Sequence, residues 1–168
     1  MKILLLSDTH GYLDEGILKH ADAADEIWHA GDFGTIEVAD QLQKIKPLRG
    51  VWGNIDGKDV RIVYPLDNRF TIDGLDVWMT HIGGYPGHYE QRVRNILTAY
   101  PPQLFICGHS HILKVMRDAK YNMLCMNPGA AGVHGFHKVR TMICFEINKG
   151  KIEKPEVIEL GLRGKLQQ

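Results

Sequence analysis

Five short apolar segments of this sequence end in residues that can bind a metal ion, usually beside a glycine. These endings are Asp8-Thr9-His10, Gly31-Asp32, Gly53-Asn54, Thr80-His81 and Gly108-His109-Ser110-His111. Each motif alone is a weak indication, because Asp-x-His recurs by chance and Gly-Asp is an ordinary turn. Their shared place after predicted strands argues against coincidence, because the carboxyl ends of strands form the ligand crevice of an α/β sheet.

The spacing and the donor atoms indicate the chemistry. Residues two apart in an extended segment project to the same side, so Asp8 with His10, and His109 with His111, are each placed to present two ligands. Oxygen and imidazole donors without sulfur suit Mn, Fe, Ni or Zn and argue against copper or iron–sulfur clusters. Seven donors are too many for one catalytic ion but divide evenly between two if one carboxylate bridges. The division places Asp8, His10, Asp32 and His111 on one ion and Asp32, Asn54, His81 and His109 on the other.

The elements that position these residues follow a βαβ pattern at first. Apolar strand-like segments at 2–7, 26–30 and 48–52 alternate with amphipathic stretches at 14–23 and 36–45. Asp73-Gly74 lies between two alternating segments and predicts a β-hairpin of 70–72 with 77–80. Later we expect a helix at 88–100, strands at 104–107, 114–117, 122–126, 140–147 and 151–160, and turns at 127–129 and 148–150. The pattern predicts one α/β domain over residues 1–162, with two packed sheets flanked by helices, and a frayed tail at 163–168.

Composition excludes several classes of protein. The chain has 168 residues, about one domain, and its 20 Lys and Arg balance its 20 Asp and Glu, so strong binding to nucleic acid or membranes is not expected. Its apolar runs are too short for a membrane span or a signal peptide, which predicts a cytoplasmic protein, with homo-oligomers left open. Cys107, Cys125 and Cys144 show no CxxC spacing, and we expect buried, reduced thiols.

Taken together and in order, the motifs from Asp8 to His111 resemble the calcineurin-like metallophosphoesterases, especially their small bacterial and archaeal phosphodiesterases. Asn127-Pro128-Gly129 is a weaker later match. The resemblance implies a four-layer αββα sandwich and a dinuclear centre with the ligand division above. It further implies that a hydroxide bridging two divalent ions, Mn first and otherwise Ni, Fe or Zn, hydrolyses a small phosphodiester. Asp32, Asn54 and His81 would carry the metal-assisted catalysis.

The sequence departs from the family pattern at two places. Many relatives have a histidine directly after Gly-Asn, where it protonates the leaving group, but this chain has Ile55. The small phosphodiesterases commonly lack that histidine too. The loop Ile82–Tyr89 after His81 replaces a shorter, glycine-led turn, and we expect it to shape substrate access, with Tyr85 and His88 as candidate contacts.

Further polar residues are candidates for supporting roles. We expect His29 and Asp56 to orient the ligands rather than to bind metal. Asn127 begins the glycine-containing segment 127–132, which is either only a turn or one whose glycines aim backbone N–H groups at a phosphate. His88, His134 and His137 lie in glycine-rich loops that either edge the crevice or face water.

Two other functions remain open at this point. One is an interaction scaffold, as in the retromer subunit with this fold, and the other is hydrolysis of a monoester, nucleotide or pyrophosphate at the same site. The complete set of seven ligands favours an enzyme over a scaffold. Two divalent ions, two carboxylates and a hydroxide sum to +1, which matches a singly charged diester better than a dianionic monoester.

Overall fold

The computed structural model describes residues 1–164, in which strand β1 (Lys2–Leu6) is buried on both faces. Ile3 and Leu5 point into an apolar core between two sheets, whereas Leu4 and Leu6 point into a second core beneath helices. This burial on both faces explains why the predicted strand reads as a continuous apolar run.

The first sheet has five strands in the order β12-β11-β1-β2-β3. Strands β1, β2 and β3 are parallel, and β11 and β12 are antiparallel neighbours. The bounds of the strands other than β1 are Glu26–His29 (β2), Leu48–Gly50 (β3), Val139–Asn148 (β11) and Lys151–Leu162 (β12).

The second sheet also has five strands, in the order β4-β5-β8-β10-β9. Its inner strands β5, β8 and β10 are parallel, while β4 and β9 pair antiparallel at the edges. Their bounds are Asp67–Ile72 (β4), Leu75–Thr80 (β5), Leu104–Ile106 (β8), Leu113–Asp118 (β9) and Met123–Pro128 (β10). The predicted hairpin is confirmed, because Asp73 and Gly74 connect β4 to β5.

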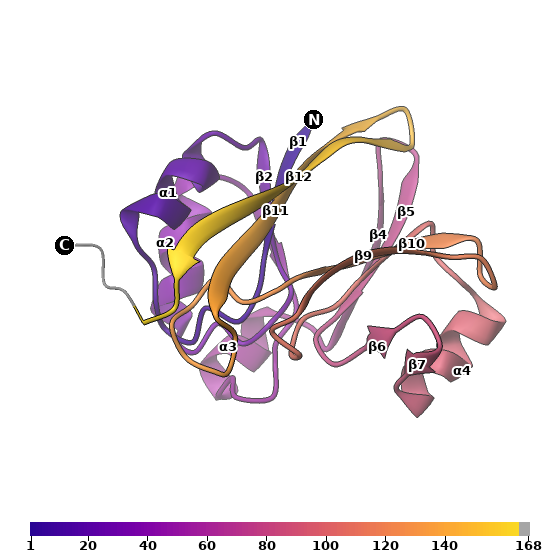
Figure 1. Cartoon of the computed structure of the whole chain (residues 1–168), viewed down its shortest axis with the longest axis horizontal. Helices are drawn as coiled ribbons and strands as arrows, with labels where there is room; N and C mark the ends of the chain where they lie inside the picture. The colour runs from indigo at the N-terminus through magenta and orange to yellow at the C-terminus, as the bar shows by residue number, and fades with distance from the viewer. Residues whose placement is uncertain (165–168) are drawn as a thin grey trace.

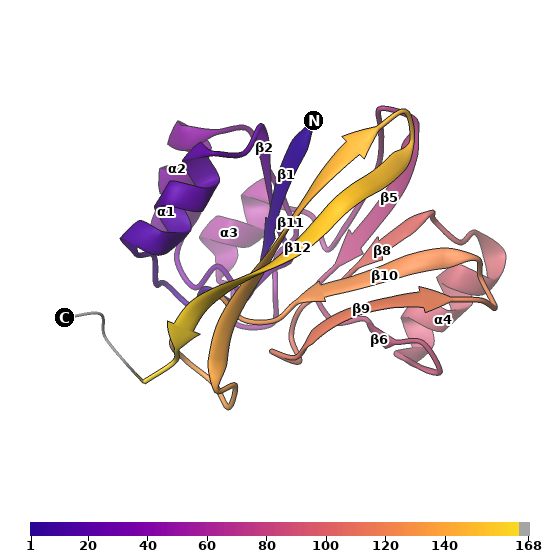
Figure 2. The same ribbon diagram turned by 45° about the horizontal axis from the view of Figure 1, so that its top comes forward.

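Helices cover the outer face of each sheet, as Figures 1 and 2 show. Helices α1 (Glu15–Asp22) and α2 (Ile36–Ile45) pack on the first sheet, and the short α3 (Lys58–Val63) adds Val60 to the same core. Helix α4 (Gln91–Ala99) packs Val93 and Leu97 on the outer face of the second sheet. The two sheets lie between these helices, so the predicted four-layer αββα arrangement is confirmed.

Some predicted boundaries are wrong. Helix α4 begins at Gln91 rather than at His88, because β7 (His88–Tyr89) pairs with β6 (Gly84–Tyr85) in a small hairpin. Asn127 and Pro128 do not form a turn but end β10, and the chain turns at Gly129, which has a φ of 73°. Helix α3 lies in a segment after β3 for which the sequence analysis predicted no helix.

Two expectations about the chain's periphery also need correction. Cys144 is half-buried, because it lies among the charged side chains of Lys2, Glu146 and Glu156, whereas the other two cysteines are buried. Arg163 is not frayed: its N–H donates to Lys138 O at 3.0 Å and its Nε donates to His137 O at 2.9 Å. The rest of the predicted tail, 165–168, lies outside the described residues. Within residues 1–164, every helix is too short or too polar to cross a bilayer.

Candidate metal centre

The loops that follow β1, β2, β3, β5 and β8 bring the candidate ligands together. Two groups of donor atoms form there, each with its atoms within 4.8 Å of one another. The first contains Asp8, His10 and His111, and the second contains Asp32, His81 and His109. Ligands from four of the five predicted segments therefore converge in these groups, and Asn54 from the fifth lies beside His81 and His109.

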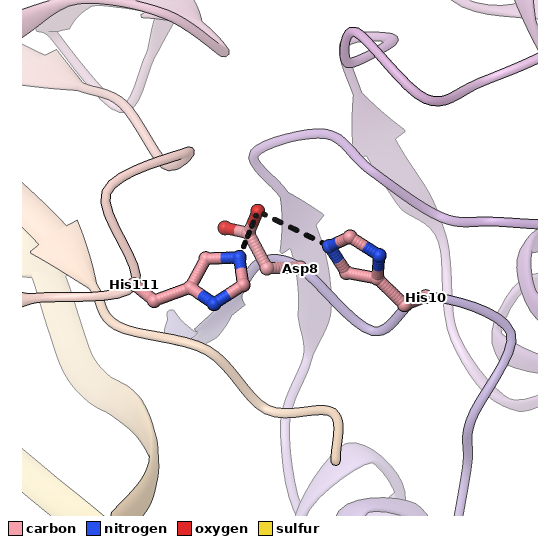
Figure 3. Close-up of side chains that lie close together, drawn as sticks. All are labelled: Asp8, His10 and His111. Atoms are coloured by element: carbon pink, nitrogen blue, oxygen red, sulfur yellow. Dashed lines mark ion pairs between the residues drawn. The ribbon is translucent and has the colours of Figure 1, made fainter. Parts of the chain in front are cut away.

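In the first group, both histidines face one carboxylate oxygen (Figure 3). Oδ1 of Asp8 lies 3.2 Å from Nε2 of His111 and 3.8 Å from Nε2 of His10. Oδ1 of Asp8 and Nε2 of His10 are buried and have no hydrogen-bond partner among the described residues. Buried polar atoms are normally paired, so two unpaired atoms that face each other fit a bound cation.

Asp32 lies between the two groups. Its Oδ2 is 3.5 Å from Nε2 of His10 and 3.2 Å from Nε2 of His81. Asn54 completes the second group, with Oδ1 at 3.1 Å from Nε2 of His81 and 2.9 Å from Nδ1 of His109. One carboxylate oxygen thus faces donors of both groups, as a bridging ligand must.

The backbone of the site is unusual. Five of the seven candidate ligands have a left-handed φ: Asp8 (54°), His10 (47°), Asp32 (57°), His109 (68°) and His111 (59°). The left-handed region costs a residue other than glycine roughly 1–2 kcal/mol, and such residues cluster at functional sites. The extended geometry expected for Asp8-x-His10 and His109-x-His111 is therefore wrong. Asp8 and His10 still face the same group, while His109 and His111 face different groups.

Two glycines permit the close approach of these loops. A Cβ atom on Gly53 would overlap the carboxylate of Asp32, and one on Gly108 would overlap Oγ of Ser7. Ser7 in turn donates from Oγ to Oδ2 of Asp8 at 2.6 Å. Larger residues at either glycine would push a ligand loop out of place.

Asp56 holds two ligand loops together. Its carboxylate accepts hydrogen bonds from the N–H groups of Phe33 at 3.2 Å, Gly34 at 2.8 Å and Gly53 at 2.8 Å. The first two follow Asp32 and the third precedes Asn54. Asp56 thus orders the ligand loops, the supporting role that its place in the sequence suggested.

His29 is fully buried behind the metal centre and stacks on Phe33 with ring centroids 3.7 Å apart. Its Nδ1 accepts from the N–H of Gly31 at 3.2 Å. Nε2 therefore carries the proton and donates to Oγ1 of Thr9 at 2.9 Å, and Thr9 donates to Phe33 O at 3.1 Å. Burial lowers the pKa of His29 to about 3, which keeps the ring neutral.

Asn127 supports the loop that carries His109 and His111. Its Nδ2 donates to Gly108 O at 2.9 Å and to Oγ of Ser110 at 3.1 Å, and its Oδ1 accepts from the N–H of Gly129 at 3.0 Å. The N–H groups of Gly129, Ala131 and Gly132 donate to Asn127 Oδ1, Ser7 O and Asp8 O. These three N–H groups are therefore engaged within the protein and not presented to a phosphate.

His137 fixes the orientation of His111. Nε2 of His137 donates to Gly132 O at 2.9 Å, so its Nδ1 accepts from Nδ1 of His111 at 3.2 Å. Burial lowers the pKa of His137, consistent with a neutral ring. Because Nδ1 of His111 is engaged by His137, Nε2 is the ring atom that faces Asp8 and would bind a metal ion there.

The electrostatics of the site favour a cation. Burial alone would raise the pKa of Asp8, but the imidazoles of His10 and His111 outweigh burial and hold this pKa far below its usual range. Burial would lower the pKa of His81, but Asp32 and Asp8 outweigh burial and raise it. The carboxylate of Asp8 therefore stays ionised and draws positive charge to the site.

The centre opens into a cavity of about 240 Å³, which we call the front cavity. Its walls include His134, whose ring centroid is 5.1 Å from that of His10, and Ile55. The sequence did not identify Phe136, which lines this cavity and is fully exposed. An apolar residue between two candidate histidines in a glycine-rich loop was the available signal.

The side chains of Tyr85 and His88 lie outside the front cavity. Their rings contact each other with centroids 4.8 Å apart, and Nζ of Lys114 lies 4.1 Å from the Tyr85 ring centroid. In the same loop, Ile82 lines a neighbouring cavity with Asn54 and His81. The loop therefore reaches the site through its first residue rather than through its tip.

Comparisons with known proteins agree with this geometry. Residues 1–150 match the calcineurin-like phosphoesterase superfamily domain. A probable metallophosphoesterase of Methanothermobacter thermautotrophicus is 27% identical over 140 residues, which cover 79% of this chain and 78% of that protein.

Two solved structures show the same fold. An archaeal phosphodiesterase superposes with a TM-score of 0.74 at 22% identity, covering 95% of this chain and 100% of that one. Wild-type Vps29 from Entamoeba histolytica, complexed with Zn²⁺, superposes with a TM-score of 0.71 at 17% identity, covering 95% and 99%. With a family match over most of its length and two groups of metal donors in place, this chain belongs to the calcineurin-like phosphoesterase superfamily and is a probable metallophosphoesterase.

Proposed function

We propose that the chain is a phosphodiesterase that uses two divalent transition-metal ions, Mn²⁺ first among them. The observation that carries this proposal is the place of Asp32, whose Oδ2 faces His10 in one donor group and His81 in the other. Asp8, His10 and His111 would hold one ion with Asp32, and His81, His109 and Asn54 would hold the other with it. When bound, two such ions supply a nucleophile at neutral pH and neutralise charge on a phosphoryl group.

The protein's own residues prepare this chemistry. His111 is oriented by His137, and Nδ1 of His81 donates to Ala30 O at 2.7 Å, so each ring turns Nε2 toward the centre. Fixed tautomers of this kind raise the affinity of a site for metal. The left-handed backbone and the Asp56 hydrogen bonds hold the ligand loops before any ion binds, which reduces the reorganisation needed in the reaction.

Charge and the absent acid favour a diester as substrate. Two divalent ions with the carboxylates of Asp8 and Asp32 leave a net charge of +2, and a hydrolytic nucleophile reduces it further toward the single charge of a diester. Ile55 takes the position of a protonating histidine, so a leaving group that departs easily without protonation suits the site best.

The experiment compares two chromogenic substrates. The chain is stripped with EDTA, reloaded with Mn²⁺, Ni²⁺ or Zn²⁺ in turn, and assayed with bis(p-nitrophenyl) phosphate and p-nitrophenyl phosphate. We expect the higher kcat/KM with the diester, and a loss of at least about 100-fold in His109→Ala, since loss of partners that only orient ligands already costs about 10–100-fold. His88→Ala is the matched control, because His88 is exposed and outside the front cavity.

Each other result has a defined meaning. A preference for the monoester would make the chain a phosphomonoesterase with the same centre. Two bound ions without turnover of either substrate would support the scaffold function instead. Equal losses in His109→Ala and His88→Ala would show that the proposed centre does not perform the reaction.

A further inference from the structure

Exposed apolar side chains gather around the candidate metal centre. Ile55 is 46% exposed, Leu66 40%, Ile82 37% and Phe136 102%. Ile55 and Phe136 line the front cavity, and Leu66 and Ile82 line a second cavity beside it. Apolar residues that cluster at the surface commonly mark a binding site.

The second cavity, which we call the Trp52 cavity, is continuous with the metal centre. It measures about 190 Å³, and Trp52, Leu66 and Ile82 form its apolar walls. Asn54 and His81, both members of the second donor group, also line it. A group held in the Trp52 cavity would therefore lie directly beside anything bound at the metal centre.

The walls of the Trp52 cavity are held in place. The guanidinium of Arg61 lies 4.0 Å from the Trp52 ring centroid, and the backbone N–H of Trp52 donates to Pro65 O at 3.0 Å. At the edge, Arg92 donates to Asp67 at 2.7 Å and to Oγ1 of Thr80 at 2.8 Å. Preformed apolar walls with a few fixed polar groups are typical of small-molecule sites.

We propose that the Trp52 cavity binds a planar aromatic ester arm of the substrate, while the phosphoryl group of the same molecule lies at the metal centre. The proposal rests on the proposed phosphodiesterase function and specifies its substrate class. Size supports it, since an apolar cavity of about 150 Å³ admits benzene. Chemistry supports it too, because a diester has an arm beyond the phosphorus that needs a place next to Asn54 and His81.

The experiment measures binding apart from turnover. The probes are diphenylphosphinate and dimethylphosphinate. Each carries a single negative charge and contains no ester bond, but only the first has aromatic groups on phosphorus. Isothermal titration calorimetry of the Mn²⁺-loaded protein gives the ratio of their dissociation constants. The variants are Leu66→Ala and Ile82→Ala, and the control is Ile62→Ala, whose side chain is 82% exposed on α3 and outside the Trp52 cavity.

We expect wild type to bind diphenylphosphinate at least about 10-fold more tightly than dimethylphosphinate. Each cavity variant should weaken the diphenyl probe by about 3- to 10-fold, as lost apolar contact predicts, with the dimethyl probe and the control unchanged. Equal binding of the two probes, absence of binding, or loss of the diphenyl probe's advantage in Phe136→Ala alone would overturn the proposal. The last result would place the aromatic arm in the front cavity.

Turnover of bis(p-nitrophenyl) phosphate is measured on the same samples, so the two proposals fail separately. Aromatic preference that depends on Leu66 without turnover would leave the Trp52 cavity supported and refute the phosphodiesterase function. Turnover without aromatic preference would support the phosphodiesterase function and refute the proposal for the Trp52 cavity. Thermal unfolding of each variant confirms that the fold is intact before binding is compared.

Discussion

The carboxylate of Asp56 accepts a hydrogen bond from the N–H of Gly53 at 2.8 Å and so ties the loop of Asn54 to the loop of Asp32. In Asp56→Ala, the N–H groups of Gly53, Phe33 and Gly34 lose their acceptor. Gly53 and Phe33 are buried, and an unsatisfied buried donor costs about 1–3 kcal/mol. We expect the free energy of unfolding, measured with urea, to fall by about 3 kcal/mol.

The control for this change is Asp22→Ala, at an exposed position at the end of α1, where we expect a change within about 0.5 kcal/mol. A loss below about 1 kcal/mol in Asp56→Ala would show that the loops are held by other contacts.

His29 should make stability depend on pH. Its pKa is about 3 in the folded chain, because burial disfavours the charged ring, and about 6.5 when unfolded. A lowered histidine pKa means that the unfolded state takes up the proton first. Its contribution is therefore complete above about pH 6.5 and falls by about 1.4 kcal/mol per pH unit as the pH drops toward 3.

The measurement is the free energy of unfolding of wild type and His29→Gln between pH 4 and 7, since the glutamine amide is polar, has N–H donors and does not titrate. The variant should lose less stability than wild type over this range. Parallel curves would mean that His29 does not titrate differently in the two states.

Much of the site could be predicted because its ligands lie close in sequence to the strands that position them. Each ligand lies within a few residues after the end of a strand, and the parallel pairing of β1, β2 and β3 brings three of these strand ends together. The backbone conformation could not be predicted in the same way. Asp8 and His10 look extended in sequence, yet their left-handed φ depends on bonds across the fold, such as the N–H of Asp8 to Gly31 O at 3.0 Å.

The errors at the site's rim have similar causes. His88 stands at the start of a stretch with helical spacing of apolar residues, but it pairs with Tyr85 in a hairpin and lies outside the helix. Asn127 has a turn-forming sequence, but its amide is needed by the loop of Gly108 and Ser110. Phe136 was missed because its place between two candidate histidines is a weak signal, and its neighbours in space are what bring it to the front cavity.

The absence of an acid at Ile55 predicts a steep dependence of rate on the leaving group. A positioned general acid contributes about 10²–10⁴-fold, and it matters most for poor leaving groups. Among diesters of decreasing leaving-group acidity, kcat should fall steeply in wild type and less steeply in Ile55→His, compared at equal metal content. A shallow slope in wild type would point to another acid, and His134, in the wall of the front cavity, would be tested first.

The Ile82–Tyr89 loop should select substrates through its first residue. Ile82 lines the Trp52 cavity, whereas Tyr85 packs against His88 and Lys114. Ile82→Ala should change the ratio of kcat/KM between bis(p-nitrophenyl) phosphate and methyl p-nitrophenyl phosphate by about 3-fold or more, and Tyr85→Ala should leave this ratio unchanged. A larger change of this ratio in Tyr85→Ala than in Ile82→Ala would show that the tip of the loop selects the substrate.

The number of Mn²⁺ ions bound per chain tests the central claim most directly. Oδ2 of Asp32 lies 3.5 Å from Nε2 of His10 and 3.2 Å from Nε2 of His81, whereas Oδ1 of Asp8 is 3.9 Å from Nε2 of His81. Asp32→Ala should therefore weaken both sites, whereas His10→Ala should remove one ion and leave the other. Titration of metal-free protein, followed by metal analysis after desalting, should give two ions in wild type, one in His10→Ala and fewer than two in Asp32→Ala. Saturation of wild type at one ion, or two tightly held ions in Asp32→Ala, would contradict a dinuclear centre bridged by Asp32.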